Sequence, residues 1–427
     1  MYSKYLLYRN FLPSFFFSVL SIIFIKVRIN VKWEQRKLNS IAHQTFGGGT
    51  PSKSNKQFWN GDFPWIQSSD LAEDTIRGVH PNKFITQNAL LISAAKKIPK
   101  NSIAIVSRVG VGKVALIPFN YSTSQDFLSL SSLKINSQFA TYSIHKIMKK
   151  TASQLQGTSI KGITKKDILN KTIIFPISEK EQVHISSLLK YVDYIISLQQ
   201  RKLEQLKRLK KAMLQQLFAN NNSKQPNLRF KNFKGDWEQC KLGELIESLF
   251  QGINTAADKV EYSNNGLPII QAKNITSGSL DFSGSRKLSV QKYSNYLDKY
   301  IPQKGDILFA NIGTIGPNVI LKDTRQFFIA WNILRIVPQK NINGEFLKIT
   351  LDLLNSKHYF EKLLTGNATK FVNKNDMRNL PIFFSDPEEQ NKISNLFKKL
   401  DFLITLQQNK LTQLTILKKY LLQKMFI

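Results

Sequence analysis

The chain has 427 residues, and its 61 Lys and Arg residues against 29 acidic residues give a formal net charge of +32 at pH 7. Such an excess indicates a polyanionic partner, nucleic acid first and an anionic membrane surface second; a solvated basic surface from Lys-rich codon usage is the alternative. The single cysteine, Cys240, excludes a disulfide framework and a cysteine-based zinc site and fits a reducing cytoplasm. The five histidines show no His-x-x-x-His spacing, so no motif indicates a metal site.

The first 30 residues contain an uncharged, apolar stretch from Asn10 to Ile25. Its 16 residues are few for a membrane span, and Lys26 and Arg28 follow it without a small-residue cleavage site. We expect residues 1–30 to be an extension from a misplaced start or a frameshift. A genuine membrane anchor and a structural element of the first domain are the alternatives.

The rest of the chain repeats itself at offsets of 203 to 209 residues. Three motifs occur twice. The motif "WEQRKL" at Trp33 returns as "WEQCKL" at Trp237, and "PWIQSSDL" at Pro64 returns as "PIIQAKNI" at Pro268. The motif "IPKNSIAIVSRVGVGKVALI" at Ile98 returns as "IPQKGDILFANIGTIGPNVIL" at Ile301. A looser copy relates Gly157 to Gly366. The repeat predicts a globule at 31–178, a helix at 179–220, a linker at 221–236, a second globule at 237–385 and a second helix at 386–427.

Each globule mixes short β-rich runs, such as "SIAIVS", "DILFANI", "KTIIF" and "ILRIV", with Gly turns and a few helices. Helices do not alternate regularly with these strands, so we predict a mixed α/β (α+β) fold rather than a doubly wound sheet. The two globules resemble each other less than the two helices do, which indicates that the globules were free to diverge.

Both long helices have start signals and no internal Pro or Gly. Ser178 and Glu181 form a capping-box pattern, and Asp386 and Glu389, with Pro387 at the first helical position, form its counterpart. Each run continues for about forty residues, which corresponds to ~60 Å of helix.

A heptad pattern runs along each helix with 3-4 spacing. Two polar residues interrupt each seam at matching places, Gln199 and Lys210 in the first and Gln407 and Lys418 in the second. A seam of this kind needs a covering helix, and we predict that the two helices cover each other as an intramolecular antiparallel coiled coil with pseudo-twofold symmetry. Packing on another protein or another copy of the chain is the alternative. The apolar seam positions are Leu189, Val192, Ile196, Leu203, Leu206, Met213, Leu217, Phe397, Leu400, Ile404, Leu411, Leu414, Leu421 and Met425.

Two basic globules at opposite ends of a stiff rod suit duplex DNA, whose helical repeat is about 34 Å. Two divergent readers would recognise two short sequences separated by an unread spacer of fixed length. The architecture therefore predicts a split DNA target.

The order of these motifs resembles the specificity subunit of type I restriction-modification enzymes, over about residues 31 to 427. The resemblance rests on "WEQRKL", "GGGTPS", "WNGDFPWIQSSDL", "QAKNI", "GDILFANIGTIG" and the paired helices. It implies two target recognition domains, one per half-site, joined by helices that dock two methyltransferase subunits and accompany restriction (motor) subunits. S-adenosylmethionine, ATP and magnesium are then expected on those partners and no cofactor in this chain. The leader "LRFKNFKGDW" before Trp237 has no counterpart before Trp33, which puts the start of the chain in doubt.

Base reading favours Arg, Asn and Gln, while phosphate contacts favour cations and hydroxyls. The Gly-rich stretch after Phe46 is interpreted as a plain surface loop or a DNA-facing one, its glycines supplying positive φ or a close approach to phosphate. The stretch from Arg108 to Leu116 lacks phosphate-loop spacing and is predicted to be a turn between two strands. The DNA-binding candidates are Lys53, Lys56, Trp59, Gln67, Ser68, Ser69, Arg108, Lys113, Gln156, Thr158, Ser159 and Lys161 in the first globule, and Gln271, Lys273, Asn274, Asn311, Thr314, Asn332, Asn367 and Lys370 in the second.

No carboxylate pair, Ser/His/Asp set or metal cluster is arranged for catalysis, so the chain is predicted not to be an enzyme by itself. The leading hypothesis is a cytoplasmic DNA-specificity subunit that does not bind membranes. The alternative is a coiled-coil scaffold without sequence-specific DNA binding, tethered to a membrane by residues 10–25.

Overall fold

The computed structural model describes residues 32–73, 75–155, 162–219, 223–276, 278–365 and 370–426. The chain divides into two compact units: the first contains residues 1–200 and 410–427, and the second contains residues 201–409. The proposed extension at 1–30 and its apolar stretch lie outside the described residues. Within these ranges, no helix combines the length and hydropathy needed to cross a bilayer.

The first unit is built on a four-stranded antiparallel sheet of order β2-β8-β5-β6 and a three-stranded sheet of order β4-β3-β7, in which β3 and β7 are parallel. A third pair, β1 and β9, joins the start of the globule to its end. The strands are β1 (Trp33–Lys37), β2 (Ala42–Gly47), β3 (Phe63–Ile66), β4 (Lys83–Ile85), β5 (Ser102–Val106), β6 (Val114–Ile117), β7 (Ser122–Thr123), β8 (Phe127–Leu133) and β9 (Thr172–Pro176).

The second unit repeats these three sheets and adds the antiparallel pair β13 and β14. Its four-stranded sheet has the order β11-β19-β16-β17, its three-stranded sheet has the order β15-β12-β18 with β12 and β18 parallel, and β10 pairs with β20. The strands are β10 (Glu238–Lys241), β11 (Ile246–Gln251), β12 (Leu267–Ile270), β13 (Ile275–Thr276), β14 (Ser279–Leu280), β15 (Lys287–Leu288), β16 (Ile307–Ala310), β17 (Asn318–Ile320), β18 (Phe328–Ile329), β19 (Ile333–Pro338) and β20 (Pro381–Phe384). The mixed α+β fold of two related globules is confirmed.

Helices complete each globule. The first unit has η1 (Leu38–Ser40), η2 (Lys56–Trp59), η3 (Ser68–Asp70), α3 (Gln87–Ile92), α4 (Ser137–Leu155) and α5 (Lys165–Asn170). The second has α7 (Leu242–Leu245), η4 (Ala272–Asn274), η5 (Ser294–Tyr296), α8 (Leu297–Tyr300), α9 (Gly344–Ser356), η6 (Tyr359–Leu363) and α10 (Lys374–Arg378). Equivalent asparagines, Asn136 and Asn343, accept hydrogen bonds from the first turns of α4 and α9 and so fix where these helices begin.

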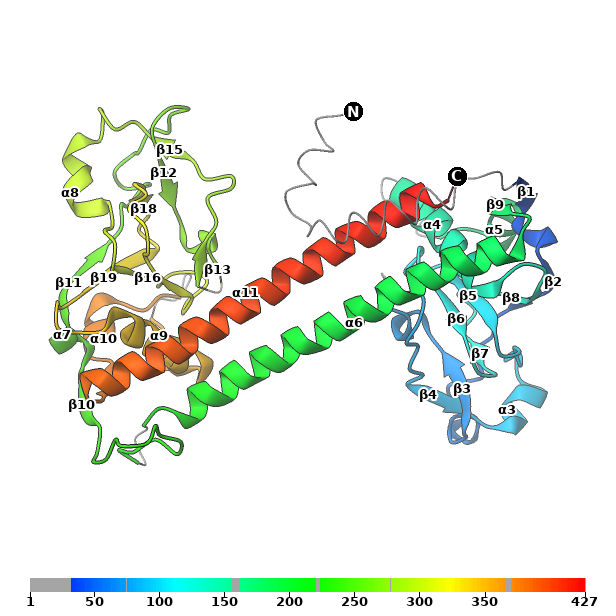
Figure 1. Cartoon of the computed structure of the whole chain (residues 1–427), viewed down its shortest axis with the longest axis horizontal. Coiled ribbons are helices and arrows are strands. Elements are labelled where there is room, and N and C mark those ends of the chain that lie inside the picture. The colour runs from blue at the N-terminus through cyan, green and yellow to red at the C-terminus, as the bar shows by residue number, and fades with distance from the viewer. Residues whose placement is uncertain are drawn as a thin grey trace. The chain divides into compact units, whose positions relative to one another are not determined.

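The two long helices, α6 (Glu179–Gln216) and α11 (Pro387–Lys424), have 38 residues each and are unbroken (Figure 1). Every predicted seam position is buried or half-buried: Leu189, for example, is 0% exposed, and Ile404 is half-buried. Residues such as Tyr194 and Phe402 on the other faces are exposed, at 59% and 67%. The predicted seam is therefore the buried face of both helices.

One ion pair joins the two long helices inside each unit. In the first unit Lys418 on α11 contacts Asp193 on α6, and in the second unit Lys210 on α6 contacts Asp401 on α11, both at 2.6 Å. In each unit an early residue of one helix thus meets a late residue of the other, as the predicted antiparallel pairing requires. The lysines that interrupt the heptads are the members of these pairs.

The end of each long helix is fixed by stacked aromatic rings. In the first unit Phe426, just after α11, stacks on Phe139 of α4 with ring centroids 5.0 Å apart. In the second unit Phe218, just after α6, stacks on Phe346 of α9 at 5.4 Å. These contacts place the helix ends in the two hydrophobic cores, with Leu421 in the first and Leu217 in the second.

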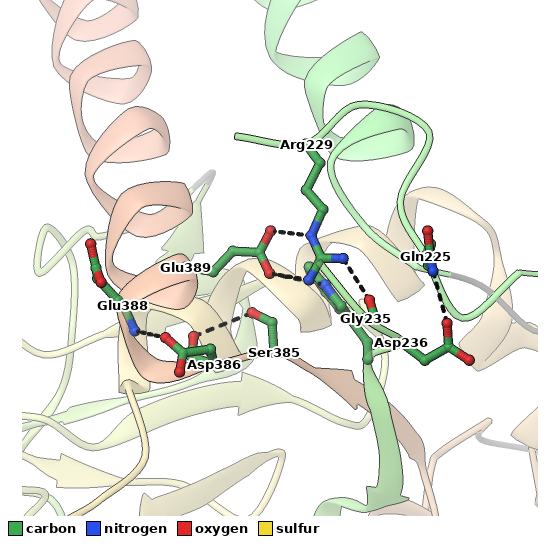
Figure 2. A network of polar contacts seen from close by, with 9 residues as sticks. Gln225, Arg229, Gly235, Asp236, Ser385, Asp386, Glu388 and Glu389 are labelled. Atoms are coloured by element: carbon green, nitrogen blue, oxygen red, sulfur yellow. Dashed lines mark hydrogen bonds and ion pairs between the residues drawn. The ribbon is translucent and has the colours of Figure 1, made fainter. Parts of the chain in front are cut away.

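The start of α11 is bound to the preceding leader segment in the second unit (Figure 2). Arg229 donates two hydrogen bonds to the Glu389 carboxylate at 2.8 and 2.9 Å and a third to the Gly235 carbonyl, and the Trp237 indole donates to Glu389 at 3.1 Å. Asp386 caps the helix by accepting from the Glu388 amide at 2.7 Å.

Among the described residues, the predicted capping box is absent at the start of α6 and only half formed at the start of α11. Glu389 does not return to the helix start, because the bidentate guanidinium is a stronger partner than a backbone N–H. In the described part of the chain Glu181 makes no side-chain hydrogen bond either, and the first turn of α6 is closed by the Ser178 carbonyl instead.

Candidate nucleic-acid interface

Four connecting segments of the first unit are joined by hydrogen bonds at one place, which we call the meeting point. They are the turn between β5 and β6, the link between β7 and β8, the segment before α5, and η3. The Ser107 amide at the end of β5 donates to the carbonyl of Asp126, which links β7 to β8, and the Ser107 carbonyl accepts from Ile163 before α5. The Lys113 ammonium, in the turn between β5 and β6, donates to the Ser68 carbonyl in η3 at 3.1 Å. Residues far apart in sequence therefore form one polar surface beside the sheet ends.

The second unit builds the same meeting point from equivalent residues. The Asn311 amide donates to the Asn332 carbonyl, and the Asn311 carbonyl accepts from Val372. The Asn332 side chain accepts from the Ala272 amide in η4 at 3.1 Å. The arrangement of connections is thus a property of the fold, whereas the side chains on them differ between the units.

Two equivalent glycines allow the chain to pass close to the link after the parallel strand pair. A Cβ on Gly48 would overlap the Ser124 carbonyl oxygen, and one on Gly252 would overlap that of Ala330. Gly47, Gly48 and Gly49 have no positive φ, so the expectation of a positive-φ turn there is wrong. The glycines are needed because protein backbone lies against them.

The turn between β5 and β6 confirms the strand-turn-strand interpretation of the stretch after Arg108. Gly110 and Gly112 have φ of 96° and 108°, values that residues with a Cβ rarely adopt. Arg108 is exposed in this turn and Lys113 is half-buried.

Aromatic and basic side chains gather over the small sheet of the first unit. Trp59 meets Trp65 edge to face with centroids 4.9 Å apart, and the Lys83 ammonium lies 5.9 Å from each ring centroid. Lys83 also donates to the Gln67 amide oxygen at 3.5 Å. Lys83 was not predicted, although it faces Trp65 directly across the β3–β4 ladder; only the strand pairing reveals it.

A second group of cations surrounds the Gly-rich stretch. The pKa of Lys165 is lowered, first by burial and then by the positive charges of Arg108 and Lys96, with Asp126 acting in the opposite direction. Cations held close enough to repel one another favour an anionic ligand such as a phosphate. Sequence reasoning missed both: Lys96 lies in no repeated motif, and Lys165, although it lies in the looser repeat after Gly157, was not singled out.

The predicted DNA-binding residues differ in exposure. The exposed ones are Lys53, Lys56, Ser69, Arg108, Lys273, Thr314 and Lys370. The half-buried ones are Trp59, Gln67, Ser68, Lys113, Gln271 and Asn332. Gln156, Thr158, Ser159, Lys161 and Asn367 lie outside the described residues.

Two predicted base readers have structural roles. Asn274 is 5% exposed, and its amide binds the Gln271 amide and the Asp281 carbonyl. Asn311 is 1% exposed, and its side chain donates to the Val372 carbonyl at 3.0 Å. Both were named as DNA-binding candidates, and their buried amides are instead held by protein partners.

The described residues include no group of three or more His, Cys, Asp or Glu side chains placed to hold a metal ion. The one thiol, Cys240, is half-buried, and burial together with Glu244 and Glu238 raises its pKa to about 11. At neutral pH this thiol is protonated, which disfavours it as a nucleophile.

Known proteins share this arrangement. The family described as "Type I restriction modification DNA specificity domain" matches residues 30–208 and 234–415. The chain is 27% identical over 351 residues to the type I restriction enzyme MjaIX specificity subunit of Methanocaldococcus jannaschii, covering 78% of this chain and 76% of that one. It is 33% identical over 149 residues to the EcoR124I/EcoR124II specificity subunit of Escherichia coli, covering 32% and 36%.

A solved structure shares the fold. The type I restriction-modification system S subunit from M. genitalium superposes with a TM-score of 0.60 at 17% identity, covering 94% of this chain and 97% of that one. The chain therefore belongs to the family of type I restriction-modification DNA specificity domains and carries two copies of that domain.

Proposed function

We propose that this chain selects the DNA sequence for a type I restriction-modification complex and reads a bipartite target, with one globule on each half-site. The target recognition domains are residues 31–178 and 237–385, and α6 and α11 set the unread spacer. One observation carries the proposal: the two units share one sheet topology, but different side chains lie on the four connecting segments of their meeting points. Equivalent frames with divergent surfaces suit two different half-sites.

The charge of the chain supports double-stranded DNA as the partner. A net charge of +32 provides many phosphate contacts, and Lys53, Lys56, Lys96, Arg108 and Lys165 are placed for them in the first unit. Base reading falls to the half-buried and exposed polar residues at the meeting points, such as Gln67, Gln271 and Asn332.

The chain works with other subunits in this proposal. Two methyltransferase subunits dock on the long helices and carry S-adenosylmethionine, and restriction subunits supply the ATP- and magnesium-dependent reactions. The chain itself is non-catalytic and the assembly acts in the cytoplasm. Exposed apolar residues on the outer helix faces, including Tyr191, Phe402 and Leu406, are 61%, 67% and 54% exposed and support docking there.

Methylation mapping of the source cell, with and without this gene, tests the proposal. Loss of one adenine-methylated motif made of two short sequences and a fixed gap is the expected result. If deletion leaves every methylated motif unchanged while the gene is expressed with its partners, or removes a motif without a gap, the proposal is wrong.

A further inference from the structure

Trp331 differs from the other tryptophans of the chain. It is 42% exposed, whereas Trp65 and Trp237 are each 2% exposed. Trp33, Trp59, Trp65 and Trp237 all pack against another aromatic ring. Within the described ranges the Trp331 indole packs on no ring or cation, and its N–H has no hydrogen-bond partner.

The backbone that carries this indole is held by hydrogen bonds to the strand β11 and the residues after it. The Trp331 amide donates to the Ile253 carbonyl at 2.7 Å, and its carbonyl accepts from the Gln251 side chain. The flanking residues Ala330 and Ile333 are 1% and 0% exposed. A large exposed ring on a backbone held in this way loses little conformational entropy on binding, which is the property of an interface residue.

Trp331 lies at the meeting point of connections in the second unit. Its neighbour Asn332 binds both η4 and the end of β16. Gly48 approaches Ser124 as Gly252 approaches Ala330, so Trp331 occupies the place of Gln125, which is exposed in the first unit. The equivalent residue is polar, so the fold does not require an aromatic ring here.

We propose that Trp331 is a specificity-determining contact for the second half-site. This inference rests on the proposed function. The indole presents an apolar face, which suits a thymine methyl group or a base face, and an N–H that donates to a base acceptor in the groove. The first unit, with Gln125 at this place, reads its half-site without an aromatic contact.

The test uses the chain assembled with its methyltransferase subunits and duplexes carrying the mapped target. We expect Trp331→Ala to weaken binding to the intact target about tenfold, consistent with the roughly 1–3 kcal/mol value of one base contact. Among single base-pair changes in the second half-site, the change at the pair that Trp331 contacts should cost the Trp331→Ala variant little further affinity, while the other changes and a scrambled first half-site should still be rejected. Trp331→Phe keeps an aromatic ring and loses the N–H donor, so its affinity for the intact target should lie between those of the parent chain and Trp331→Ala.

Tyr262→Ala is the matched control, because Tyr262 is an exposed aromatic residue of the same unit in the segment between β11 and β12. It should leave the DNA affinity unchanged. Thermal melting of each variant shows that the globule is folded, and Trp331→Phe keeps the test decisive if the alanine variant is unstable.

Three results would overturn the inference: parent-like discrimination by both Trp331 variants, an equal loss of affinity for target and unrelated duplex, or weaker association with the methyltransferase subunit at unchanged DNA discrimination. The last would assign Trp331 to a protein interface. Failure of the parent assembly to prefer its mapped target would instead contradict the proposed function.

Discussion

Two equivalent glutamates at the starts of the long helices have different surroundings. Glu389 is 1% exposed and is bound by Arg229 and Trp237. Glu181 is 9% exposed and its carboxylate has no such partner in the described part of the first unit. Burial raises the pKa of Glu181, with His184 acting in the opposite direction. The ionised glutamate therefore stabilises the fold at position 389 of the second unit, but not at position 181 of the first.

We predict opposite responses to the same substitution at these positions. Glu389→Gln leaves the Arg229 guanidinium without its charged partner and should lower the free energy of unfolding by about 3 kcal/mol. Glu181→Gln removes a poorly solvated charge and should not lower it at pH 7. Denaturant unfolding of both variants checks this, and equal destabilisation by the two would contradict it.

The pH dependence of the Glu181 variant has a defined sign. A folded-state pKa above the unfolded value means that the native state holds the proton more tightly. The parent chain therefore loses stability relative to Glu181→Gln as the pH rises from about 4, near the unfolded pKa of Glu, toward neutrality. Unfolding measured between pH 4 and 7 should show the stability of the variant rising relative to the parent, and a fall relative to the parent over this range would contradict the prediction.

Local patterns predicted local contacts and missed distant ones. The Asp386 cap follows from residues adjacent in sequence and is confirmed. The role of Glu389 depends on Arg229, 160 residues away. Asn274 and Asn311 looked like base readers because burial is not visible in a single motif.

At the scale of elements, the heptads predicted the seam, because apolar periodicity directly reports the buried face. The antiparallel pairing was predicted from the order of the parts, since each helix follows its own globule. The reason for the two seam lysines was missed. Asp193 and Asp401 are separated by the same 208 residues as Lys210 and Lys418. This equal spacing is the sequence signal from which the two ion pairs, each joining a seam lysine to an aspartate of the other helix, could have been predicted.

The two ion pairs are not equally important. Asp193 and Lys418 have side chains 11% exposed, and Tyr142 also donates to Asp193 at 2.7 Å. Asp401 is 46% exposed. Asp193→Asn should cost about 3 kcal/mol of stability, whereas Asp401→Asn should cost under about 1 kcal/mol. Thermal unfolding of the two variants measures the difference, and a larger cost at Asp401 would contradict this account.

The ion pairs also constrain how the spacer can be lengthened. Seven residues inserted in α6 alone, between Asp193 and Lys210, would break the register with α11. Matching insertions in α6 and α11, each adding about 10 Å of helix, keep both pairs. We expect the double insertion to lengthen the gap in the methylated motif with both half-sites unchanged, as motif mapping would show. An unchanged gap, or altered bases, would contradict the role of the helices as a spacer.

At the scale of the whole molecule, the repeat predicted the order of parts and the β-rich runs became β5, β9, β16 and β19. The pairing of these strands was not predictable, because the parallel pairs β3–β7 and β12–β18 join segments about 60 residues apart. The meeting points of the four connections depend on that pairing. Sequence motifs therefore found some of the residues there and missed Trp331, and they missed Lys83 and Lys96 elsewhere in the first unit.

The central claim is that each globule reads one half of a split DNA target. Replacing residues 33–178 with the same region of a relative, while keeping α6 and the α11 residues that complete the first core, tests it most directly. Methylation mapping of cells carrying the hybrid should show one half of the motif changed, with the other half and the gap retained. A motif in which both halves change, or neither does, would contradict the account.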